Sequence, residues 1–136
     1  MTPAARRRKL LARRSKPMKA RIMTVDDEPI FRDLVKLLLV REGYEVSEAA
    51  DCASVRRAFD GLAPNLVLLD LVLPDGNGLA LLPELKQRWP DTKVIVLTGH
   101  PAVEAAENAY RVGDVLWLNK PFDSAMLKAM IELALA

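Results

Sequence analysis

The chain has 136 residues, 51% of them hydrophobic, which suits one globular domain large enough to bury a core. Its net charge of +2 is unevenly spread, because nine of the 20 Lys and Arg residues and none of the 18 acidic residues lie in residues 1–21. The lone Cys52 excludes an intrachain disulfide, and no apolar run reaches membrane-spanning length or forms a secretory signal, so we expect a cytoplasmic protein.

Residues 1–18 are predicted to form a flexible basic arm ahead of the domain. Such a charge run can bind nucleic acid or another acidic surface. The same composition is typical of a solvated, disordered tail, and translation starting at Met18 is a further alternative. If the arm does bind, we expect nonspecific electrostatic contact, because no aromatic residue is interleaved with the basic ones.

Short apolar segments alternate with helical patterns along the rest of the chain. The expected strands are residues 21–25, 44–48, 66–69, 94–97 and 115–118. The expected helices are residues 29–42, 53–62, 79–89, 101–112 and 123–135, closed by glycine or proline in four of the five cases. Apolar residues recur at helical spacing in the first helix (Ile30, Leu34, Leu37, Leu38) and are expected to face inward in the last (Met126, Leu127, Met130, Ile131, Ala134). This alternation predicts an α/β fold, a doubly wound five-stranded parallel sheet with five helices.

Polar or charged residues that can bind ligands or react follow four of the predicted strands. Asp26 and Asp27 follow the first strand, Asp70 the third, Thr98 the fourth and Lys120 the fifth. Ligands of such folds bind at the carboxyl ends of the strands, so these side chains are expected to gather at one edge of the sheet. Three carboxylates, a hydroxyl and an ammonium there predict a site for a divalent cation and a phosphoryl group.

Each residue has a role in that chemistry. A carboxylate can attack phosphorus and form an acyl phosphate, and Asp70 is the candidate because it ends the central strand. Mg²⁺ suits Asp27 and Asp70 as direct ligands and Asp26 through water. Lys120 and Thr98 can bind phosphoryl oxygens. Each residue taken alone also has a structural explanation, such as helix capping by the acidic pair.

Four motifs in chain order resemble the receiver domains of two-component response regulators. They are Val25–Pro29, Leu66–Asp70 with Leu73–Gly76, Val96–His100 and Asn119–Phe122, and the resemblance covers residues 19–136. It implies a flavodoxin-like sheet of order 2-1-3-4-5 and a cis bond between Lys120 and Pro121. It also implies that Asp70 takes phosphate from a sensor histidine kinase or a histidine phosphotransfer protein, with Mg²⁺ or Mn²⁺ bound by the three carboxylates and the backbone carbonyl of Val72.

The resemblance further implies a conformational output. On phosphorylation, the Thr98 hydroxyl and an aromatic residue, here Trp117, are expected to move. This movement changes the surface made by the fourth helix, the fifth strand and the fifth helix, and that surface then contacts a downstream target or a second copy of the chain. Trp117 replaces the usual Tyr or Phe, and an alternative is that it anchors a partner without rotating. Val72 and His100 lie where the family controls the attacking water, and the apolar Val72 predicts a persistent phosphate. His100 could orient that water, and the alternative is that it is an exposed loop histidine.

Three rival interpretations compete with a phosphoacceptor receiver. A hydrolase of the haloacid-dehalogenase kind needs a second Asp two residues after the nucleophile, where this chain has Val72. A pseudo-receiver that only binds partners conflicts with the intact acidic and basic set. A receiver cut from a larger DNA-binding regulator or hybrid kinase stays open. We therefore expect a signalling phosphoacceptor rather than an enzyme with turnover.

Overall fold

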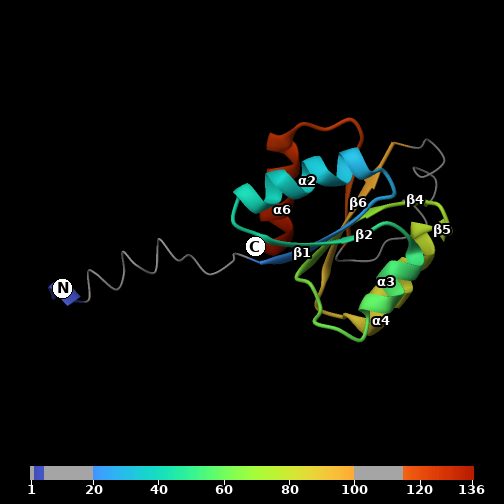
Figure 1. Ribbon diagram of the computed structural model, residues 1–136, viewed down its shortest axis with the longest axis horizontal. Helices are drawn as coiled ribbons and strands as arrows, with labels where there is room; N and C mark the ends of the chain where they lie inside the picture. The colour runs from blue at the N-terminus through green and yellow to red at the C-terminus, as the bar shows by residue number, and fades with distance from the viewer. Residues whose placement is uncertain (1, 5–19, 100–114) are drawn as a thin grey trace.

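A five-stranded parallel sheet forms the centre of the computed structural model, which describes residues 2–4, 20–99 and 115–136. Its strands lie in the order β2-β1-β3-β6-β7 (Figure 1), which confirms the predicted order 2-1-3-4-5. Their bounds are β1 Arg21–Val25, β2 Glu45–Ala49, β3 Leu66–Asp70, β6 Lys93–Thr98 and β7 Val115–Asn119. The residues of β3 before Asp70 are fully buried, because this central strand is covered on both faces.

Helices cover both faces of this sheet. Helices α2 (Pro29–Arg41) and α6 (Ser124–Leu135) lie on one face, and α3 (Cys52–Ala58) and α4 (Leu81–Arg88) lie on the other (Figure 1). Between β3 and α4 the chain forms a small hairpin of β4 (Val72–Leu73) and β5 (Gly76–Asn77), then the 3₁₀ turn η1 (Gly78–Ala80). The helix predicted at residues 101–112 lies outside the described residues. Among the described helices, none is long and apolar enough to cross a membrane.

The apolar face predicted for α2 is wrong at three of its four residues, and Leu38 alone packs partly buried against the core. Ile30, Leu34 and Leu37 are 72%, 61% and 58% exposed, whereas Val35 and Leu39 are buried against the sheet. Helix α2 carries two apolar stripes with the same helical spacing, so periodicity alone could not choose between them. The sheet packs against the stripe of Val35 and Leu39, and the other stripe is left in solvent.

Two other helices differ in detail from the prediction. Helix α3 ends at Ala58 because the Phe59 N–H donates to the Arg56 carbonyl in a tighter turn, which leaves Leu62 exposed rather than packed. On α6 the residues Leu127 and Ile131 are buried as predicted, but Met126 faces solvent. The Gly43 φ of 93° lies in the left-handed region, which confirms glycine as the residue that ends α2.

Candidate functional site

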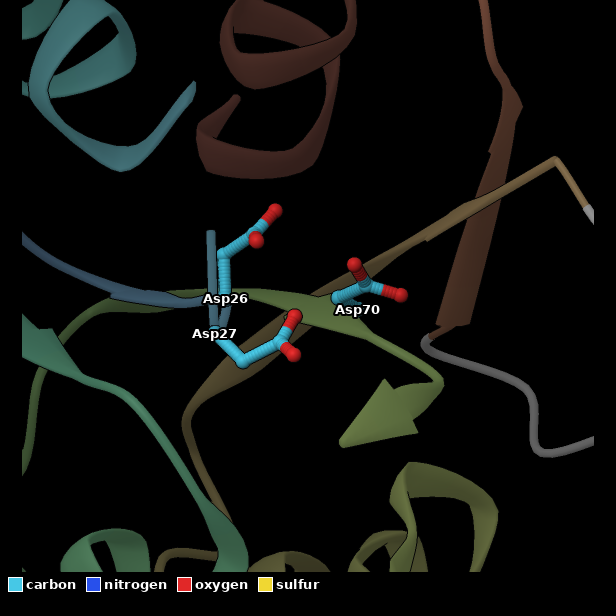
Figure 2. Close-up of side chains that lie close together, drawn as sticks. All are labelled: Asp26, Asp27 and Asp70. Atoms are coloured by element: carbon cyan, nitrogen blue, oxygen red, sulfur yellow. The ribbon is translucent and has the colours of Figure 1, made fainter. Parts of the chain in front are cut away.

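The three predicted carboxylates meet at the carboxyl edge of the sheet. Asp26 and Asp27 directly follow β1, and Asp70 ends β3, its neighbour in the sheet. One oxygen from each of the three lies within 4.8 Å of the other two. Figure 2 shows the three side chains gathered at the ends of these strands. Parallel pairing therefore brings together acids that are far apart in the sequence.

Asp26 is the most buried of the three carboxylates, with only 4% of it exposed. Its Oδ1 accepts the Glu28 N–H at 2.8 Å, and its backbone carbonyl accepts Nη1 of Arg32 at 2.6 Å. Burial raises the pKa of the Asp26 carboxyl, against the opposing effects of the Glu28 N–H and of Lys120. The ionised form of Asp26 is therefore costly in this position, and a bound cation would stabilise it.

Lys120 reaches into the same site from the end of β7. Its Nζ lies 3.1 Å from Oδ2 of Asp70 and 3.5 Å from Oδ2 of Asp26. The Lys120 N–H donates to the Thr98 carbonyl at 2.7 Å, which fixes the lysine backbone beside the end of β6. Thr98 is buried there, and the bond between Lys120 and Pro121 is cis, which confirms the expectation.

The segment after Asp70 is closely fitted to that residue. The Val72 N–H donates to Oδ1 of Asp70 at 3.0 Å, and the Val72 side chain is 60% exposed. A Cβ on Gly78 would lie 2.6 Å from the Asp70 carbonyl oxygen, a distance that only glycine avoids. These contacts fix the backbone on which Asp70 and the Val72 carbonyl are carried.

The remaining predicted residues stand apart from this cluster. Trp117 lies on β7 opposite Val96 and packs partly buried on the side of the sheet covered by α3 and α4. His100 lies outside the described residues. The structure thus brings together Asp26, Asp27, Asp70 and Lys120, with the main chain of Thr98 beside them.

Three residues of this region were missed in the sequence. Phe31 lies with its ring under the Lys120 ammonium, Arg32 holds the Asp26 carbonyl, and Asp75 accepts the N–H groups of Cys52 and Ala53. Those N–H groups lower the pKa of Asp75. The Pro-Asp-Gly turn marked Asp75 as a loop residue, but no local pattern connects it to α3.

The donor set fits a hard divalent cation. Carboxylate oxygens are the ligands that Mg²⁺ prefers, and three of them are clustered here around a position that disfavours unpaired negative charge. Lys120 brings one positive charge to this cluster of three carboxylates, and it pairs with Asp70 and Asp26. The acidic cluster therefore has both the chemistry and the residual charge to hold such an ion.

Comparison with known proteins gives a consistent result. Residues 22–132 match the family described as the response regulator receiver domain. The transcriptional regulator NtrC of Proteus hauseri is 34% identical over 86% of this chain and 25% of its own length. FixJ of Bradyrhizobium diazoefficiens is 33% identical over 86% of this chain and 57% of its own length. The chain thus spans about a quarter of one relative and little more than half of the other.

Solved structures agree with these relatives. The receiver domain of NtrX from Brucella abortus is 40% identical with a TM-score of 0.76, covering 84% of this chain and 97% of that one. A CheY-like receiver domain protein from Methanospirillum hungatei is 32% identical with a TM-score of 0.78, covering 85% of this chain and 92% of that one. Both similarities extend over nearly the whole of the solved domain.

Proposed function

This chain belongs to the response regulator receiver domain family, a family of signalling domains, and on that premise we propose that Asp70 is its phosphoacceptor. The observation that supports this best is the arrangement around one Asp70 oxygen. Lys120 Nζ lies 3.1 Å from Oδ2 of Asp70, while the carboxylates of Asp26 and Asp27 lie within 4.8 Å. An acyl phosphate on Asp70 would thus form beside a fixed ammonium and a cation site.

In the proposed reaction an Asp70 carboxylate oxygen attacks the phosphorus of the donor. The new O–P bond forms as the bond from phosphorus to the donor breaks, and the bonding electrons leave with the donor. Lys120 transfers its contact from the carboxylate to a phosphoryl oxygen, and the Thr98 hydroxyl donates to another. Hydrolysis later restores the carboxylate, so the protein catalyses only its own phosphorylation and dephosphorylation.

We propose Mg²⁺, or Mn²⁺ in its place, as the cation. Asp26, Asp27, Asp70 and the Val72 carbonyl would hold it, and their oxygen chemistry supports that assignment. When bound, it would neutralise charge on the transferring phosphoryl group. The residues themselves supply the nucleophile, the ammonium and the fixed backbone.

We propose that the phosphate on Asp70 is long-lived. Val72 is exposed and apolar, so it offers no hydrogen bond that would orient an attacking water. His100, which the resemblance assigns to the same water path, remains a proposal, as does the movement of Thr98 and Trp117 on phosphorylation. Replacing Val72 with Glu is expected to shorten the lifetime, and a wild-type half-life of seconds would contradict the idea.

We propose that a histidine kinase or phosphotransfer protein docks on the exposed stripe of α2. Ile30, Leu34, Leu37 and Val40 are all more than half exposed, and the stripe begins three residues after Asp27. Replacing Leu34 and Leu37 with Ala should slow transfer from the kinase but not from acetyl phosphate. A loss with both donors would instead indicate damage to the site.

The output surface and the wider context are also proposals. Met126 and Leu133 of α6 are exposed and lie on the helix beside β7, which supports signalling from that side to a target or a second copy. We propose residues 19–136 as the receiver and residues 1–18 as the basic arm, which could contact nucleic acid or an acidic surface. The longer relatives are transcriptional regulators and support a receiver within a DNA-binding regulator, and a hybrid kinase is the alternative. The lone cysteine supports a cytoplasmic location.

The test is phosphorylation by acetyl phosphate, recorded as intact mass with Mg²⁺ and with EDTA. We expect one phosphoryl adduct on the wild-type chain that disappears with EDTA and in Asp70→Asn. Asp60→Asn is the matched control, because this exposed carboxylate lies between α3 and the start of β3 and pairs with Arg88 at the end of α4. No adduct under any condition would contradict the proposal and favour a pseudo-receiver that acts without phosphorylation.

A further inference from the structure

We propose that Phe31 is a positioning residue that holds the Lys120 ammonium at the phosphoryl site through its aromatic face. The inference rests on the proposed function, because it assigns Lys120 a phosphoryl oxygen as its eventual partner. Phe31 is neither an acid nor a ligand, and it lies on α2 rather than on a strand end.

The geometry places the ammonium between three partners. Lys120 Nζ lies 4.5 Å from the centroid of the Phe31 ring, within the range of a cation–π contact. The same nitrogen lies 3.1 Å from Asp70 Oδ2 and 3.5 Å from Asp26 Oδ2. The Lys120 side chain is 27% exposed, so the contact is only partly screened by water.

The ring is itself held in place. Phe31 makes an edge contact with Phe122, with ring centroids 5.9 Å apart and planes at 75°. Phe122 follows Lys120 by two residues, so one ring of α2 touches both the lysine side chain and the segment that carries it. Both rings pack against the buried cluster under α2 and α6. Phe31 therefore has few alternative positions.

The ring and the carboxylates attract the ammonium in different ways. Asp26 and Asp70 attract it through their charge, and that charge is compensated when the acidic cluster holds a cation. The same cation repels the ammonium. The Phe31 ring has no net charge, so its attraction persists in the loaded site. Phe31 thus keeps Lys120 near Asp70 at the stage when the carboxylates hold it least.

The experiment compares Phe31→Leu, which keeps an apolar side chain but removes the ring, with Phe31→Tyr, which keeps the ring. Phe59→Leu is the matched control, since the Phe59 ring lies 5.5 Å from the Arg88 guanidinium on the opposite face of the sheet. Phosphorylation by acetyl phosphate is timed at saturating Mg²⁺, and Mg²⁺ affinity is measured separately by isothermal titration calorimetry. Urea unfolding of Phe31→Leu, Lys120→Met and the double variant, without metal, measures their coupling.

We expect Phe31→Leu to slow phosphorylation by about three- to tenfold, which is the scale of a partly screened cation–π contact. Phe31→Tyr and Phe59→Leu should stay close to the wild-type rate. Mg²⁺ affinity should not weaken in Phe31→Leu, because the variant leaves every metal-binding group in place. In the unfolding cycle the Phe31→Leu cost should be smaller when Lys120 is already absent.

Several results would overturn the inference. Phosphorylation of Phe31→Leu at the wild-type rate would do so, as would equal losses of rate in Phe31→Leu and Phe31→Tyr. A loss of Mg²⁺ affinity in Phe31→Leu as large as its loss of rate would also do so. So would additive effects of Phe31→Leu and Lys120→Met on the free energy of unfolding. A wild-type chain that takes up no phosphoryl group would instead contradict the proposed function. The unfolding cycle would still test the contact between Phe31 and Lys120 in that case, because it needs neither Mg²⁺ nor phosphate.

Discussion

Replacing Asp26 with Asn should stabilise the metal-free protein while removing its response to Mg²⁺. Asp26 is buried, and burial is the main cause of its raised pKa. Asn has nearly the same shape, and its side-chain oxygen can still accept the Glu28 N–H that Asp26 accepts at 2.8 Å. The substitution therefore changes the charge at this position and little else.

The distances give the size of the effect. At an effective dielectric constant of about 20, two unit charges no more than 4.8 Å apart repel by at least about 3.5 kcal/mol, and Asp26 has two neighbours within that distance, Asp27 and Asp70. Attraction between Asp26 and Lys120, whose charged atoms are 3.5 Å apart, offsets about 4.7 kcal/mol of this repulsion at the same dielectric constant. The net repulsion is roughly 2 kcal/mol before the cost of burying the charge. We expect Asp26→Asn to raise the free energy of unfolding by about 1–2 kcal/mol, allowing for relaxation of the site.

Urea denaturation at neutral pH measures this in EDTA and in Mg²⁺. In Mg²⁺ at tenfold above its Kd, the wild type should gain about 1.4 kcal/mol and the variant much less. Asp33→Asn, on the exposed side of α2, is the control for removing a carboxylate near the site. A variant less stable than the wild type in EDTA, with the control unchanged, would refute the argument that the acidic cluster strains the metal-free fold.

Three further predictions concern the surroundings of the site. Gly78→Ala should cost about 1–3 kcal/mol of stability and slow phosphorylation, because the alanine methyl group would clash with the Asp70 carbonyl oxygen. Urea unfolding at the wild-type midpoint would contradict this. Asp75→Asn should flatten the acid denaturation profile. The pKa of the Asp75 carboxyl is lowered in the folded protein, so Asp75 stabilises the fold above its usual pKa of 3.8, and that stability is lost as the pH falls through the folded-state pKa. Acid denaturation profiles of equal slope for the variant and the wild type would exclude that role. Leu39→Ala should cost about 2–5 kcal/mol and Leu34→Ala less than about 0.5 kcal/mol, and equal unfolding midpoints would mean that the buried face of α2 is wrongly assigned.

Much of the site was predictable because of one topological rule. Asp26, Asp27, Asp70 and Lys120 each stand at or just past the end of an apolar strand, and the carboxyl ends of parallel strands share one edge of the sheet. The strands are short runs rich in branched apolar residues, so their positions could be predicted from local sequence. The observed strand ends differ from the predicted ones by about one residue. The four motifs then supplied the family and the strand order.

Local sequence patterns gave the wrong buried face where two apolar stripes of one helix had the same helical spacing. Helix α2 has apolar residues on two stripes, and only contact with the sheet shows that Val35 and Leu39 are buried while Leu34 is exposed. Helix α3 likewise stops at Ala58 although its apolar pattern continues to Leu62. Periodicity gives the angle between side chains around a helix, but it does not give the side on which the rest of the protein lies.

Strand ends and residue types are local properties, so the sequence was enough to predict which groups reach the carboxyl edge of the sheet. The distances between these groups, and the residues that support them, depend on how the elements pack in three dimensions. Lys120 meets Asp70 across 50 residues of sequence, and Phe31 lies beneath its ammonium from a different layer of the fold. Such contacts depend on how the crossover helices pack on the sheet, and no pattern within a single segment records that packing.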